Sequence, residues 1–378
     1  MPAPRRRAVR LLLAVPWLVL GAWLAWLASD LVAAQRLADP AWIASRVDAV
    51  EGRRAEIRHE PVSLQPKGDA DAPRLWIFGS SSVAAPSHAA FTEPLARHLA
   101  QRGQAAVIDN LGWEGMVSWD VRARLDDAWQ IADAQGVRPD LVVLYYGHND
   151  VTYTWHFALE LPHFDAVMAP TWLLSPEGLR GPRDDGNTYW LFGHRRAGPL
   201  LKQVQQAGLL TLDPAAFDPL RERTARVFEE VTRDFLGATR GVPVMVVPVV
   251  GNLEAEPWGP IQTATALWQD GMAAADPGTR LDLLRQARDA ETFTPDMRTK
   301  SEMLAMLRSL GPPTTEGPAP VTVCDLEGRL ERAGARFGDD LFEDPVHFSE
   351  HGFDQMTGVI ADCLVEGPLR LPAEPEAP

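Results

Sequence analysis

The feature that most constrains this chain is a short apolar run that ends at a glycine and is followed at once by three serines. The run is Leu75–Phe78, the glycine is Gly79, and the serines are Ser80–Ser82. An apolar run of this length, bounded by polar residues, predicts a strand buried on both faces of a parallel sheet. Ligands of such sheets bind beyond the carboxyl ends of the strands, so the serines are expected at the mouth of a site. A turn in which serine merely caps the next helix is the other interpretation.

Similar apolar runs recur along the chain and alternate with segments whose apolar residues have helical spacing. Strands are predicted at 74–79, 105–110, 140–146, 243–249 and 321–324, and helices at about 88–102, 117–135 and 214–238. This alternation predicts an α/β domain with a parallel sheet and right-handed crossovers.

Two stretches interrupt the alternation. The first, at about 151–212, is rich in proline and aromatic residues, and a loop of this length is typical of a segment that caps or shapes a site. The second, at about 260–312, has apolar residues at helical spacing and predicts two or three inserted helices. The domain is expected to span 74–370, with a disordered tail at 371–378.

The N-terminus predicts a membrane anchor. Four arginines between residues 5 and 10 precede an uncharged stretch at 11–28, which as a helix would span roughly 27 Å and reach across a bilayer core. Arginines on that side place the N-terminus in the cytoplasm. We therefore expect a single-pass anchor at 1–35 in the cell inner membrane, a juxtamembrane linker at 36–73 and a periplasmic domain. A signal peptide cleaved near 32–34 is the alternative.

The net charge bears on the kind of partner that the protein can bind, and the two cysteines bear on the compartment in which it folds. The formal net charge of −15 argues against a nucleic-acid partner, because phosphate binding needs clustered Lys and Arg. The two cysteines, Cys324 and Cys363, are expected to pair in an oxidising compartment. Two buried thiols that act as small apolar groups are the alternative.

Three further stretches supply the other parts that an acyl-transfer site requires. A serine nucleophile needs a base, and the base needs a group that orients it; Asp344 and His347, three residues apart, offer both. Asn110–Gly115 and Gly147–Asp150 each follow an apolar run. They place hydrogen-bond donors at the ends of strands, where donors can hold the oxyanion that forms when a carbonyl is attacked.

These stretches carry a resemblance to a known family. Gly79-Ser80-Ser81, Asn110–Gly115, Gly147-His148-Asn149-Asp150 and Asp344-Pro345-Val346-His347 occur in this order and resemble the four signature blocks of the SGNH (GDSL-like) hydrolases. Residues 262–310 also resemble the helical insertion of membrane-attached bacterial members. The resemblance implies a flavodoxin-like three-layer α/β/α domain.

The resemblance also implies a role for each site residue. Ser81 is the nucleophile, and its amide is the first oxyanion donor. The backbone N–H of Gly115 and the side-chain amide of Asn149 are the second and third donors. His347 is the general base, and Asp344 orients it. No metal or organic cofactor is implied.

The chain departs from the family pattern in its first block. Ser80 stands where the family usually has Asp, and Ala85 replaces a glycine that often occurs later in that block. Neither position performs the chemistry in the family pattern. The first departure leaves open whether Ser80 or Ser82 takes the place of Ser81.

The expected function is therefore cleavage of an acyl or acetyl ester carried by a small molecule, a lipid or a polysaccharide. An O-acyltransferase acting on a cell-envelope polysaccharide and a catalytically idle envelope protein are the alternatives. A zinc site at His347 and His351 is a further interpretation, although the sequence shows no obvious third ligand. His148 and Asp150, on either side of Asn149, are expected to shape their loop.

Overall fold

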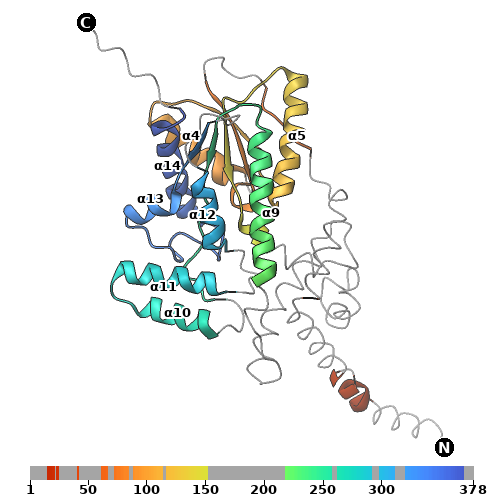
Figure 1. The fold of residues 1–378 in the computed structure, drawn as a ribbon, viewed down its shortest axis with the longest axis vertical. Helices are drawn as coiled ribbons and strands as arrows, with labels where there is room; N and C mark the ends of the chain where they lie inside the picture. Colours follow the sequence, from red (N-terminus) through yellow and green to blue (C-terminus); the bar gives the residue numbers. More distant parts are fainter. Residues whose placement is uncertain are drawn as a thin grey trace, which may run out of the picture. The chain divides into compact units, whose positions relative to one another are not determined.

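The structure is a computed structural model (Figure 1), and the residues that it describes are 15–21, 23–24, 41, 61–66, 72–84, 88–113, 116–151, 218–257, 262–291, 298–310 and 320–369. The chain divides into two compact units, one with 56–153 and 218–378 and the other with 1–55 and 154–217. The first unit holds the sheet and all four motifs. Nearly all of the predicted insertion at 151–212 lies outside the described residues.

Five parallel strands form one sheet in the order β2-β1-β3-β4-β5. The strands are β1 (Arg74–Gly79), β2 (Val107–Asn110), β3 (Leu141–Tyr145), β4 (Val244–Val246) and β5 (Val321–Val323), and the one-turn helix α3 (Ser81–Ala84) follows β1. β1 pairs with β2 on one side and with β3 on the other. The strand order therefore reverses between β1 and β3, which is the switch point of a flavodoxin-like sheet and the place where ligands bind. The predicted fold class is confirmed.

Helices cover both faces of the sheet. Alternate residues of its central strands point to opposite sides, so each face of the sheet has an apolar core of its own. Leu75 and Ile77 pack in one core and Trp76 and Phe78 in the other. The first core is covered by α4 (His88–Gln101), α13 (Leu326–Arg332) and α14 (Glu350–Glu366), and the second by α5 (Ser118–Gln135) and α9 (Asp218–Gly237). All four strand residues are fully buried, which explains why β1 is a continuous apolar run.

The predicted helical insertion contains three described helices. They are α10 (Gln262–Ala273), α11 (Pro277–Ala290) and α12 (Ser301–Ser309). α10 and α11 lie side by side (Figure 1), and Asp276 begins α11 as an N-cap that accepts a hydrogen bond from the Thr279 amide at 2.8 Å. α12 packs against α9 and brings the chain back to the sheet before β5.

The end of the predicted linker packs onto the domain, which differs from the expected start near Arg74. Val62 and Leu64 are buried and belong to the core that α5 and α9 cover. The Gln65 amide donates to Asp109 Oδ1 at 2.7 Å, and Arg74 Nη1 lies 2.7 Å from Asp109 Oδ2. The Arg74–Asp109 pair explains why the segment before Arg74 packs here. A buried charge pair needs further hydrogen bonds, and the segment that contains Gln65 supplies them.

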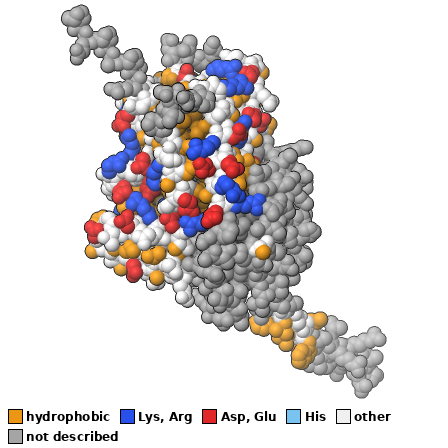
Figure 2. Space-filling view, in the orientation of Figure 1, with side chains coloured by type: hydrophobic (Ala, Val, Ile, Leu, Met, Phe, Trp, Pro, Cys, Tyr) orange, Lys and Arg blue, Asp and Glu red, His pale blue; other side chains and the backbone are white. Residues whose placement is uncertain are grey.

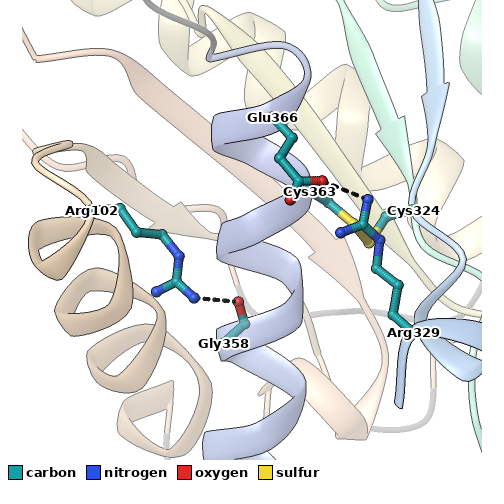
Figure 3. Close-up of a disulfide and its surroundings, with 6 residues drawn as sticks. All are labelled: Arg102, Cys324, Arg329, Gly358, Cys363 and Glu366. Atoms are coloured by element: carbon teal, nitrogen blue, oxygen red, sulfur yellow. Dashed lines mark hydrogen bonds and ion pairs between the residues drawn. A yellow bond between two sulfur atoms is a disulfide. The ribbon is translucent and has the colours of Figure 1, made fainter. Parts of the chain in front are cut away.

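A disulfide joins Cys324, just beyond β5, to Cys363 in α14, with an S–S distance of 2.04 Å and a Cα–Cα distance of 5.7 Å. Close by, Arg329 of α13 reaches Glu366 at the end of α14, with nitrogen and oxygen 2.8 Å apart (Figure 3). The predicted pairing of the two cysteines is confirmed. The bond ties the last strand to the helix that follows the fourth motif.

In the part of the chain that the structure describes, no helix is both long enough and apolar enough to cross a membrane. The described pieces of the predicted span at 11–28 are helical and expose large apolar side chains (Figure 2). Trp17 is 74% exposed and Trp23 57%. The other residues of that span lie outside the described residues. The membrane anchor stays a prediction.

Candidate active site

The first motif forms a tight turn at the carboxyl end of β1. A Cβ atom on Gly79 would collide with the carbonyl oxygen of Tyr145 and with the Val83 side chain, so only glycine fits beside β3. The Ser80 carbonyl accepts a hydrogen bond from the Val83 amide at 3.0 Å and closes the turn. The next residue, Ser81, therefore begins a helix directly above the end of the strand.

The three serines of this turn differ in exposure and in partners. Ser80 and Ser82 are only 2% and 1% exposed, whereas Ser81 is partly exposed. The Ser81 hydroxyl lies 2.8 Å from His347 Nε2. The Ser82 hydroxyl is buried and finds no hydrogen-bond partner among the residues that the structure describes. Ser81 is thus the serine of this turn whose hydroxyl contacts the imidazole.

Asp344 holds the other side of that imidazole. Its Oδ2 lies 2.6 Å from His347 Nδ1, and its Oδ1 accepts the amides of Val346 at 2.8 Å and His347 at 2.7 Å. Burial acts to raise the pKa of the Asp344 carboxyl, but the imidazole and the two amides outweigh it, and the pKa lies below its ordinary value. The carboxylate therefore stays ionised at neutral pH. It favours the tautomer that carries a proton on Nδ1 and leaves Nε2 to accept the serine proton.

The loop that carries this pair is closed at its base. Phe342 and Phe348 form an antiparallel bridge, and their rings stack with centroids 4.5 Å apart. The Asn252 amide, from the loop after β4, donates to the Pro345 carbonyl at 2.8 Å. Ser349 then caps α14 by accepting the Gly352 amide at 3.1 Å. These contacts hold the loop at the carboxyl edge of the sheet.

Hydrogen bonds connect the second motif to the turn that carries Ser81. The Asn110 side-chain amide donates to the Val83 carbonyl at 2.7 Å, and its Oδ1 accepts the Gly112 amide at 3.0 Å. The Trp113 amide donates to the Gly79 carbonyl at 3.2 Å. Gly115, the expected second oxyanion donor, lies outside the described residues. Its role stays a prediction.

The third motif follows β3, the neighbour of β1. Gly147 has φ +133°, a conformation that side chains rarely adopt. Asn149 is 2% exposed, and its Nδ2 donates to the Met116 carbonyl at 2.9 Å. That bond uses one N–H of the amide and fixes the plane in which the other points. The motif therefore brings the predicted third oxyanion donor to the edge of the sheet that also carries Ser81.

Asp150 anchors the start of α5. Its two carboxylate oxygens accept the Ser118 amide at 3.0 and 3.2 Å. Complete burial raises the pKa of Asp150 to about 7, the bond from Ser118 opposes the rise, and the nearby Asp120 charge adds to it. These contacts lie within the fold, in keeping with the expectation that Asp150 shapes its loop.

The zinc interpretation finds little support in these contacts. Both ring nitrogens of His347 already face hydrogen-bond partners. Among the residues that the structure describes, no group of three or more His, Cys, Asp or Glu side chains is placed to hold a metal ion.

Sequence reasoning missed one contact of the third motif. Thr299 Oγ1, from the segment between α11 and α12, lies 3.2 Å from Nδ1 of His148, which is itself buried. A threonine between an arginine and a lysine in a polar stretch gives no sign of burial in the sequence. Only the folded chain shows that the helical insertion contacts the site.

No protein-family model and no curated protein sequence matches the chain. Solved structures are similar to it. A lipase/acylhydrolase from Enterococcus faecalis has 14% sequence identity and a TM-score of 0.36, and the alignment covers 80% of this chain and 99% of that one. A GDSL-like lipase from Bacteroides thetaiotaomicron has 11% identity and a TM-score of 0.32, covering 85% and 97%. A peptidoglycan O-acetylesterase has 11% identity and a TM-score of 0.30, covering 89% and 98%.

The flavodoxin-like fold that the resemblance to the SGNH hydrolases implies is confirmed. The sheet has the flavodoxin-like order, and the described residues of all four motifs lie at the carboxyl ends of β1, β2 and β3 or in the loop before α14.

Proposed function

We propose that this chain is a serine esterase of the SGNH type, which cleaves an acyl or acetyl ester through an acyl-enzyme. The observation that carries the proposal is the continuous series of hydrogen bonds from Ser81 through His347 to Asp344 at the switch point of the sheet. A nucleophile, a base and an orienting carboxylate in this geometry are the parts that acyl transfer requires.

In the first half of the proposed reaction, Ser81 Oγ attacks the ester carbonyl carbon while its proton passes to His347 Nε2. The carbonyl oxygen becomes an oxyanion, which accepts hydrogen bonds from the Ser81 amide, the Gly115 amide and the Asn149 side chain. The carbon–oxygen bond to the alcohol then breaks, and the alcohol leaves with the proton from His347. The acyl group remains on Ser81.

The second half repeats these steps with water. His347 Nε2 takes a proton from water as the water oxygen attacks the acyl carbon, and the bond to Ser81 Oγ breaks when Oγ regains that proton. The product is a carboxylic acid. Throughout, the Asp344 carboxylate stabilises the transient imidazolium and does not itself become protonated.

The substrate and location form part of the proposal. The arginines before the apolar N-terminal stretch support a membrane anchor with the domain in the periplasm. The Cys324–Cys363 disulfide agrees with an oxidising compartment. An ester-bearing small molecule, lipid or polysaccharide of the cell envelope is the substrate class that this location supports.

The proposal is tested by labelling and by turnover. A fluorophosphonate probe should label Ser81, and p-nitrophenyl esters and acetylated polysaccharides should be hydrolysed. Ser81→Ala and His347→Ala should each remove nearly all turnover, and the double variant should be no worse than either single one, because the two residues act as a unit. Asn149→Ala should lose about 10²- to 10³-fold in kcat.

Ser82→Ala is the matched control, since it removes a neighbouring buried hydroxyl that has no hydrogen-bond partner within the described part of the chain; it should keep its activity. Label on Ser80 or Ser82, or full activity in Ser81→Ala, contradicts the assignment of the nucleophile. An unlabelled, inactive wild-type protein would instead favour the idle envelope protein.

A further inference from the structure

The segment between α11 and α12 is polar and buried. Arg298, Thr299 and Lys300 are only 1%, 2% and 4% exposed, although arginine and lysine are rarely buried unless they are paired. Arg298 forms an ion pair with Glu291, and its Nη1 donates to the Asn252 carbonyl at 2.9 Å. Lys300 Nζ lies 3.6 Å from a carboxylate oxygen of the same Glu291. These contacts fix the backbone on both sides of Thr299.

Thr299 in turn holds one edge of the His148 ring. Thr299 Oγ1 lies 3.2 Å from Nδ1, and Nε2 lies 3.1 Å from the Val250 carbonyl. A carbonyl only accepts hydrogen bonds, so Nε2 must carry a proton. In the neutral ring Nδ1 is then an acceptor, and the Thr299 hydroxyl donates to it.

The contacts of the His148 ring bear on the site because His148 lies between Gly147 and Asn149 in the chain. Gly147, just before it, has φ +133° and no side chain to restrain the backbone. Asn149, just after it, is the proposed oxyanion donor. The Asn149 amide is held on one side by its bond to the Met116 carbonyl, and the contacts of the neighbouring His148 ring hold the motif on the other side.

We propose that Thr299 is a positioning residue for the reaction: by holding the His148 ring, it sets the position of the Asn149 amide at the oxyanion. The helical insertion then serves the catalytic loop as well as the fold. This inference rests on the proposed esterase function, and its test is arranged so that the two can fail separately.

The variant for the test is Thr299→Val, which keeps the shape of the side chain and removes the hydroxyl. Donors to an oxyanion are effective only when well placed, and small misplacements are costly. We expect kcat to fall by roughly tenfold with KM within about twofold, and Thr299→Ser to restore kcat because it returns the hydroxyl. In an Asn149→Ala background, Thr299→Val should change kcat by less than about twofold, because the two act through one donor.

The matched control is Thr357→Val. Thr357 is fully buried in α14, and its hydroxyl donates to the Phe353 carbonyl at 2.7 Å. This variant loses a buried hydroxyl of the same kind away from the third motif, so it should keep kcat even if it is less stable. Equal losses of kcat in the two variants, or full additivity with Asn149→Ala, would reduce Thr299 to a structural residue and overturn the proposal.

Nitrogen-15 NMR provides a measurement that does not need turnover. The His148 ring should show the tautomer protonated on Nε2, and Thr299→Val should shift its Nδ1 signal and the side-chain amide signals of Asn149. Thr357→Val should move neither. If the wild-type protein lacks esterase activity, unshifted Asn149 signals in Thr299→Val still refute the positioning role, and shifted signals support it although the esterase proposal has failed.

Discussion

Replacing Asp344 by asparagine tests the proposed mechanism at the point where the geometry is most restrictive. Asp344 Oδ1 accepts two backbone amides, from Val346 and His347, at 2.8 and 2.7 Å. In Asp344→Asn the amide oxygen is expected to occupy this place, since only an oxygen can accept those two bonds. The amide nitrogen must then face His347 Nδ1, where Oδ2 stood at 2.6 Å.

Two N–H groups cannot face each other across this distance, so the imidazole proton must move from Nδ1 to Nε2. Nε2–H can only donate to Ser81 and cannot take its proton. The wrong tautomer costs on the order of 10⁴ in kcat where this exchange has been made in a serine triad, which corresponds to about 5.5 kcal/mol. The two bonds to the backbone amides are kept, so the free energy of unfolding should fall by only about 1 to 2 kcal/mol.

The assay is p-nitrophenyl ester turnover, with urea denaturation to confirm that the variant is folded. Asp276→Asn is the matched control, because Asp276 also accepts a backbone amide, that of Thr279 at 2.8 Å, at the start of α11. It should keep kcat within about twofold, since the partner of its carboxylate is Thr279 and not the imidazole of the site. An Asp344→Asn variant that is folded and retains more than a tenth of the wild-type kcat would refute the tautomer argument.

Three further predictions concern stability and location. Replacing both Cys324 and Cys363 by alanine opens a link across a sequence separation of 39, which should lower the free energy of unfolding by roughly 4 kcal/mol in urea denaturation; a loss below about 1 kcal/mol contradicts the chain-entropy reasoning. Burial raises the pKa of Asp150 to about 7, so the folded protein holds a proton that the unfolded chain has lost, and stability should fall as pH rises from about 4 to 7. Asp150→Asn should flatten that decline, and an unchanged slope tells against the raised pKa. Alkaline phosphatase fused after residue 378 should be active if the domain is exported, and an inactive but well-expressed fusion overturns the predicted orientation.

The strands could be predicted because their signal is local. The centre of a parallel sheet is covered on both faces, so Leu75–Phe78 and Leu141–Tyr145 have to be continuous apolar runs. Where a strand lies at the edge the signal weakens. β5 at Val321–Val323 is only partly buried, and it ends one residue before the predicted limit.

The elements that the sequence did not predict depend on contacts between distant segments. The apolar alternation at Val62 and Leu64 is too short to distinguish a packed segment from a linker. The two side chains are buried because they join a core whose other members come from distant parts of the chain. The short helix α13 likewise packs by Leu326 and Leu330 against a core assembled from other parts of the chain.

The residue types and order of the four motifs predicted a candidate site at the carboxyl edge of the sheet, because each motif follows its own strand or precedes its own helix, and the apolar runs predicted the sheet itself. The resemblance named Ser81 but left Ser80 and Ser82 open, and only the tertiary structure shows that the Ser81 hydroxyl meets an imidazole 266 residues further along the chain. The same holds for Thr299, whose contact with His148 spans 151 residues. Local sequence determines which backbone turns can form, whereas side-chain burial and hydrogen-bond distances between remote residues are set only when all layers of the fold are packed together.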